Sequence, residues 1–139
     1  MLYIWNIENI IQNTLQELNL EINYDFDNSL SVPMSYNVST NTIKFNYLQV
    51  NGYKSKINIK VTEENFVKLI VYRMIGYYLD YKKNKYDLRI LMFGDDEEKE
   101  DLTSKIEANA WEFGRTVVPE QLLESYDSFR DLDKLLLKH

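Results

Sequence analysis

Hydrophobic residues recur at helical spacing in the longest patterned stretch of the chain, from Thr62 to about Lys83. Their broad apolar face predicts a long helix that is buried on most of its sides. Thr62 can cap this helix, and Glu63 and Glu64 lie in its first turn, where the helix dipole favours negative charge. The face is formed by Phe66, Leu69, Ile70, Met74, Tyr77 and Tyr81.

Apolar and polar residues alternate in the first half of the chain, which predicts short strands. Residues 20–26 and 43–47 both alternate in this way, and the polar stretch 28–33 between them is expected to be a loop. Asn51-Gly52 is a turn signal. Residues 56–61 also alternate, which fits either a third strand or an extended lead-in to the long helix.

Further helical patterns lie at both ends of the chain. One follows Asn6, a candidate cap, and another begins at Thr103 and ends near Gly114. Pro119 fits the first turn of a helix over residues 120–125, and a last helix is expected at about 127–138. The whole pattern predicts one α+β domain over residues 1–139, with a long central helix, a short β-sheet and C-terminal helices.

The composition agrees with a small globular protein. The chain has 139 residues, of which 45% are hydrophobic and 27% charged. No stretch approaches the roughly 18 apolar residues of a membrane helix, and the N-terminus lacks the features of a signal peptide. A cytoplasmic protein without a membrane-spanning segment is therefore expected. Abundant Asn, Ile, Lys and Tyr are typical of AT-rich coding, as in a low-GC bacterium or its mobile elements.

Two scarce residue types limit the chemistry that the chain can perform. There is no cysteine, which excludes disulfides, thiolate catalysis and thiolate metal sites. The single histidine, His139, is the last residue, where a chain usually frays, so it is a poor base or metal ligand. No glycine-rich phosphate loop and no nucleophile-elbow motif is present. A hydrolase that uses paired carboxylates, with or without magnesium, remains an alternative because the chain has 22 acidic residues.

The charge is acidic overall, with a net charge of -6. Direct binding to nucleic acid phosphates is not expected, because it needs clustered Lys and Arg. A basic protein surface is a better match, and mimicry of nucleic acid is a further alternative. The run Asp95–Asp101 is expected to be a solvated acidic loop, or else a cation or partner site, although it lacks the spacing of a calcium loop.

Three segments in the second half of the chain share an order with a known family. The long helix contains Ile75-Gly76 and Tyr78-Leu79, and a later segment carries Glu107, Ala110 and Phe113-Gly114, followed by Pro119. With the preceding stretch at Ile43–Asn46, this resembles the ImmA/IrrE family of small zinc metallopeptidases over about residues 43–123. Such a resemblance implies a small zincin-like domain encoded by a phage or mobile element.

The catalytic residues of that family are replaced in this chain. Family members carry His-Glu-x-x-His, in which two histidines hold zinc and the glutamate acts as the general base. By the resemblance, Arg73 and Tyr77 stand where the histidines would be, Met74 replaces the glutamate, and Glu107 retains the third ligand. One carboxylate cannot replace three ligands, so no metal, cofactor or catalytic residue is expected. Arg73 is expected to pair with Glu107 across the former site.

The resemblance and these replacements together suggest a pseudoenzyme. A chain of this kind would act by binding another protein, for example a repressor or regulator of the mobile element, or a host defence protein that it inhibits. Exposed Tyr and Trp side chains would suit such an interface. The carboxylate hydrolase and the acidic mimic of nucleic acid stay as alternatives.

Overall fold

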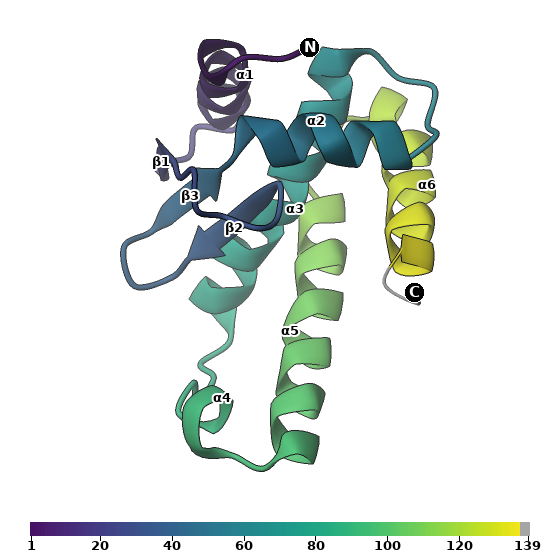
Figure 1. Cartoon of the computed structure of the whole chain (residues 1–139). Coiled ribbons are helices and arrows are strands. Elements are labelled where there is room, and N and C mark those ends of the chain that lie inside the picture. Colours follow the sequence, from purple (N-terminus) through teal and green to yellow (C-terminus); the bar gives the residue numbers. More distant parts are fainter. Residues whose placement is uncertain (137–139) are drawn as a thin grey trace.

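The computed structural model describes residues 1–136 as a mixed α+β fold around a long central helix, which confirms the predicted fold class (Figure 1). Within these residues there are six helices and one three-stranded sheet. In chain order, the elements are α1 (Ile4–Glu17), β1 (Asn23–Phe26), β2 (Met34–Asn37), β3 (Thr42–Phe45), α2 (Tyr47–Lys56), α3 (Glu63–Lys83), α4 (Ile90–Phe93), α5 (Asp96–Arg115) and α6 (Glu120–Leu136).

The sheet has the order β1-β3-β2, with β1 parallel and β2 antiparallel to the central strand β3. Ile43 and Phe45 alternate into the core along β3, as the sequence pattern predicts. β2 lies at an edge of the sheet and packs on α3, whereas β1 packs on α1. The sheet therefore covers only one end of the central helix.

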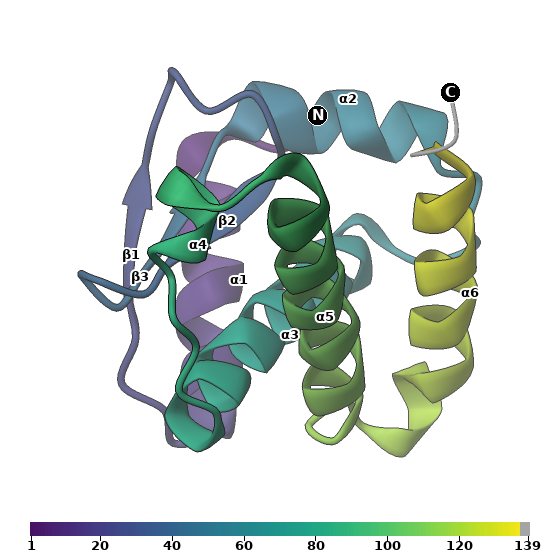
Figure 2. The same cartoon turned by 90° about the horizontal axis from the view of Figure 1, so that it is seen from below.

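The core forms around α3, where ten of the helix residues are buried. α1 packs on one side of this helix, and α5 and α6 pack on other sides (Figures 1 and 2). α3 and α5 approach so closely that a Cβ on Gly76 would overlap the backbone carbonyl of Ala110. A Cβ on Gly114 would lie 2.6 Å from the carbonyl oxygen of Tyr72. The two glycines therefore let the backbones of α3 and α5 cross in direct contact.

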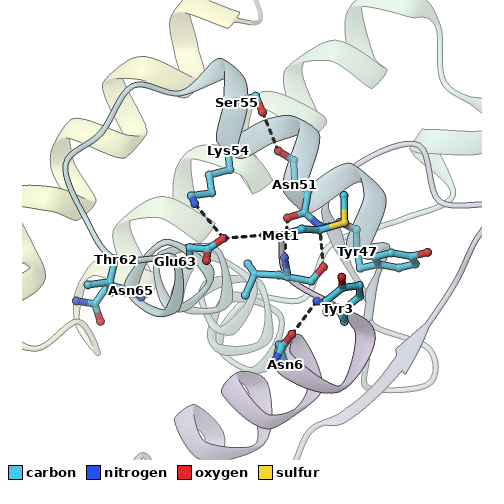
Figure 3. A network of polar contacts seen from close by, with 11 residues as sticks. Met1, Tyr3, Asn6, Tyr47, Asn51, Lys54, Ser55, Thr62, Glu63 and Asn65 are labelled. Carbon is cyan, nitrogen blue, oxygen red and sulfur yellow. Dashed lines mark hydrogen bonds and ion pairs between the residues drawn. The ribbon is translucent and has the colours of Figure 1, made fainter.

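The N-terminal segment is tied to α2 and α3 by a polar network (Figure 3). Asn51 accepts a hydrogen bond from the backbone N–H of Leu2 at 3.0 Å and donates one to the Leu2 carbonyl at 2.8 Å. Glu63 pairs with Lys54 at 3.0 Å. The predicted turn at Asn51-Gly52 is wrong, because these residues lie inside α2, where Asn51 bonds a distant segment instead of its own turn.

In the first half, the structure also decides between two open interpretations and adds a strand that the sequence pattern does not indicate. Residues 57–61 form no strand and are the extended lead-in to α3, with Thr62 as its cap, so the second of the two interpretations is correct. β2 begins just after the predicted loop and was not predicted. Its four residues are too few to show a clear alternation, and only Met34 is buried.

The second half differs from the predictions at its helix boundaries. The acidic run is exposed but is not a loop: Asp95 caps α5 in a capping box with Glu98, and the run forms the first turns of the helix. α5 therefore begins at Asp96, well before Thr103. The two C-terminal helices predicted at 120–125 and 127–138 are one continuous helix, α6, and residues 137–139 with His139 lie outside the described part.

None of the helices within residues 1–136 combines the length and apolar character needed to cross a membrane.

Candidate functional site

A cavity of about 800 Å³ lies beside the central helix. Helices α2 to α6 line it, together with β2 and the residues that precede this strand. Figure 2 shows α2, α5 and α6 arranged around this part of the molecule. The walls are mainly apolar with a few polar groups, which is the usual character of a ligand-binding site.

One stripe of α3 forms a wall of the cavity. Arg73, Tyr77 and Tyr81 follow one another at intervals of four residues, which places them on one side of the helix, and Met74 lies beside them. Glu107 reaches the same cavity from α5. The four residues assigned to the former site, Arg73, Met74, Tyr77 and Glu107, are thus brought together by the fold.

Arg73 does not pair with Glu107, so the predicted pairing is wrong. No nitrogen of Arg73 lies within ion-pair distance of that carboxylate. Its Nη1 lies 3.6 Å from Asp133 Oδ2 of α6, and its guanidinium lies 4.5 Å from the centre of the Trp111 ring. Nη2 reaches the Tyr77 hydroxyl only at 3.5 Å, and the buried Nε has no hydrogen-bond partner in the described residues. Arg73 pairs with Asp133 and not with Glu107 because Asp133 lies on the face of α6 that packs on α3.

Tyr53 of α2 completes this charged cluster by donating a hydrogen bond to Asp133. Burial raises the pKa of the Tyr53 hydroxyl well above its usual range, and the bond to Asp133 raises this pKa further. Tyr53 is therefore a neutral donor at ordinary pH. Asp133 is occupied by two partners, one from α2 and one from α3, and it links three helices at one end of the cavity.

Glu107 has a different environment, because it makes no hydrogen bond or ion pair with any residue in the range 1–136. It is half-buried and lies near enough to Tyr77 to affect the pKa of the Tyr77 hydroxyl. Burial raises the pKa of Tyr77, the Arg73 guanidinium opposes this, and the Glu107 carboxylate adds to the increase. Glu107 is thus a carboxylate on the cavity wall whose acceptor oxygens are not used by any other residue in the described part of the chain.

Tyrosine rings surround this part of the cavity. Tyr36 of β2 and Tyr81 of α3 stack with their ring centres 6.2 Å apart, and the Tyr36 hydroxyl donates to Asn41 at 2.7 Å. Tyr77 lies one turn before Tyr81 on the same helix. Burial raises the pKa values of Tyr36 and Tyr81, so both are neutral aromatic surfaces. This end of the cavity offers aromatic faces and one carboxylate.

Metal-ligating side chains do not gather in this cavity. Its lining among residues 1–136 includes two carboxylates, Glu107 and Asp133. More widely, no three His, Asp or Glu side chains within residues 1–136 are grouped so that they could hold a metal ion. What the described arrangement can do chemically is bind a ligand through apolar, aromatic and charged contacts.

Sequence reasoning missed Asp133 and Tyr53 as members of the site. The apolar residues Phe129, Leu132, Leu135 and Leu136 recur at helical spacing and predict a buried face of the last helix, yet Leu135 is 54% exposed and Asp133 is buried. Leu122, Tyr126, Phe129 and Asp133 follow a spacing of four, three and four, and this spacing was the available signal. Tyr53 gave no signal, because the segment around it was interpreted as a turn.

Comparison of the chain with protein-family models, with curated proteins and with solved structures finds no match.

Proposed function

We propose that this protein acts by binding another protein, without catalysis, and that the cavity beside α3 receives a segment of the partner. The observation that carries the proposal is the cavity itself. It has about 800 Å³ of space, mainly apolar walls and a small number of polar groups, which suits a side chain or short segment of a partner.

The residues in the cavity favour binding over catalysis. If the resemblance to the zinc metallopeptidases holds, Arg73, Met74 and Tyr77 replace two metal ligands and the general base. Arg73 keeps a permanent positive charge where a cation would lie in those enzymes. Asp133, the second carboxylate in the cavity, is held by Arg73 and Tyr53 and is poorly placed to act as a base. These features support a retained binding surface.

The partner class follows from the same resemblance. Family members are often encoded beside repressors of mobile elements, so a repressor or another regulator is one partner that the proposal allows. A host defence protein that the chain inhibits from a phage is another. Neither interaction would need a metal or cofactor in this chain.

A cavity-blocking variant tests the proposal. Thr103 is exposed on α5 and lines the cavity, so Thr103→Trp should place a bulky ring in its mouth without disturbing the core. Ser104 is the next residue, is also exposed and does not line the cavity, which makes Ser104→Trp the matched control. The tagged full chain and both variants would be used to capture proteins from a low-GC bacterial lysate, with identification by mass spectrometry.

We expect one partner to be retained by the unaltered chain and by Ser104→Trp and to be lost from Thr103→Trp. Equal retention by both variants would show that the cavity is not the binding site. Metal analysis of the purified protein tests the other half of the proposal. Stoichiometric zinc held by internal residues, together with peptidase activity, would overturn the non-catalytic assignment.

A further inference from the structure

Glu107 is the carboxylate in the cavity that the protein leaves without a partner among residues 1–136. The other lining carboxylate, Asp133, is held by Arg73 and Tyr53. A half-buried carboxylate beside apolar walls loses part of its hydration, and a hydrogen-bonding cation can restore this loss. The Glu107 carboxylate lines the cavity, where a bound ligand would meet it.

Aromatic rings lie on the same part of the wall. The crossing that sets Gly76 opposite Ala110 and Gly114 opposite Tyr72 is antiparallel. It places Glu107 of α5 at a level between Tyr77 and Tyr81 of α3, and Tyr36 stacks on Tyr81. The rings of Tyr36 and Tyr81 have no cation over them among the described residues. Their faces can therefore accept one from a ligand.

We propose that this part of the cavity binds an arginine side chain from a basic segment of the partner protein. The guanidinium pairs with Glu107 and stacks on the tyrosine rings. This inference deepens the proposed function and rests on it. Arginine fits better than lysine because its planar group can form two parallel hydrogen bonds with a carboxylate while its face contacts an aromatic ring.

The remaining charges around the cavity agree with a cationic ligand. Arg73 is paired with Asp133, so its charge is largely balanced. Lys56 lines the cavity but is exposed on the C-terminal turn of α2, where water screens it. The acidic run 95–101 lies on the same helix as Glu107, and the whole chain has a net charge of -6. Both would attract a basic segment before it docks.

The experiment is an NMR titration of the isotopically labelled full chain with four tripeptide amides, each acetyl-leucyl-X-leucine amide. X is arginine, lysine, glutamine or glutamate. We expect the arginine peptide to shift the amide signals of Tyr77, Tyr81 and Glu107. Its affinity should exceed that of the glutamine peptide by at least about tenfold, as expected for a charge-assisted hydrogen bond. The lysine peptide should bind between these two.

Glu107→Gln should lower the affinity for the arginine peptide about tenfold and leave the glutamine peptide unchanged. Glu100→Gln removes the same charge from an exposed position of α5 outside the cavity, and it should change the affinity by no more than about twofold. An arginine peptide that causes no shifts, that binds no better than the glutamine peptide, or that is insensitive to Glu107→Gln would overturn the inference.

Tighter binding of the glutamate peptide would also overturn it, because the ligand would then be an anion held by Arg73. These outcomes are separate from the test of the proposed function. If Thr103→Trp abolishes partner capture while the arginine peptide shows no preference, the cavity binds a partner but not through arginine. If Thr103→Trp has no effect on capture, the proposed function itself fails.

Discussion

The two sides of the α3–α5 helix pair contain carboxylates in opposite situations. One side of α3 carries Tyr72, Gly76 and Asp80 and is called the closed side below. On it, Asp80 is fully buried and accepts hydrogen bonds from Asn84 at 2.7 Å and from the Tyr86 hydroxyl at 2.8 Å. Asn109 of α5 donates to that hydroxyl at 2.7 Å. On the cavity side, Glu107 of α5 has no such partner within residues 1–136. The helix pair thus contains one carboxylate, Asp80, that accepts hydrogen bonds and another, Glu107, that accepts none from residues 1–136.

This difference separates a structural polar group from a candidate binding group. A buried carboxylate that serves the fold has its acceptors filled by the protein, as Asp80 does, because an unfilled one is costly. Glu107 escapes most of that cost because it is only half-buried beside a cavity. Its exposure keeps it available to a ligand, and the closed side keeps the helices in position.

The largest expected effect is on the closed side, at the helix crossing. Gly76→Ala should lower the free energy of unfolding by about 3 kcal/mol, because the added methyl group meets the backbone of Ala110 and the helices must separate. Gly52→Ala is the matched control, since nothing lies within 4 Å of its Cβ and it is inside α2. That variant should gain about 0.5 to 1 kcal/mol. Urea unfolding followed by circular dichroism measures both changes.

A loss at Gly76→Ala no larger than the change at Gly52→Ala would contradict the tight crossing. The backbones of α3 and α5 could then move apart to accept a methyl group without a large loss of stability.

The carboxylates themselves provide the next test. Asp80→Ala should cost about 2 kcal/mol, because it leaves the half-buried donors of Asn84 and Tyr86 without their acceptor. Glu107→Ala should change stability by less than about 0.5 kcal/mol, as a substitution that breaks no contact does. Both values come from the same unfolding experiment. Equal losses at the two positions would make Glu107 a structural residue and would remove the basis of the arginine site.

The smallest effect is a sensitivity to alkali on the closed side. Burial raises the pKa of Tyr72 to about 12, and the charge of Glu17 adds to the increase. The folded protein holds this proton more tightly than the unfolded chain, so stability is complete below the unfolded pKa of about 10 and falls as the pH rises toward 12. At pH 11 the loss from Tyr72 should be about 1 kcal/mol.

Tyr72→Phe supplies the control for this measurement, because a phenyl ring cannot ionise. Thermal unfolding of both proteins between pH 8 and pH 11 should show a steeper decline for the unaltered chain. Parallel curves would mean that Tyr72 does not ionise differently in the folded and unfolded states.

The sequence predicted the elements whose local signals agree with the packing. Thr62, the two glutamates after it and the apolar face of α3 all point to one helix, and the structure confirms its start at Glu63 and its end at Lys83. The turn predicted at Asn51-Gly52 is wrong because the Asn51 side chain bonds the backbone of Leu2, a contact that local spacing does not reveal. The loop predicted for the acidic run is wrong because the capping box at Asp95 stabilises a helix despite the repulsion between neighbouring charges.

The sequence singled out four residues that line the cavity, but it indicated neither Asp133 and Tyr53 nor the contacts that these residues make. Arg73, Met74, Tyr77 and Glu107 do line one cavity. The predicted ion-pair partner of Arg73 is wrong, because whether Arg73 meets Glu107 or Asp133 depends on the rotation of α6 about its axis. That rotation is set by packing of Phe129 and Tyr126 against Trp111, which joins residues far apart in the chain.

The glycine contact between α3 and α5 also decides which walls of the cavity can move. Two helices whose backbones touch have no flexible side chains between them to absorb a displacement, so they behave as a single rigid unit. Any widening of the cavity must come from its other walls, which are α2, α4, α6 and the edge strand β2 with the residues before it. The ion pair between Arg73 and Asp133 and the bond from Tyr53 cross from that rigid unit and from α2 to α6. These two contacts therefore hold α6 against α3 and α2 at one end of the cavity.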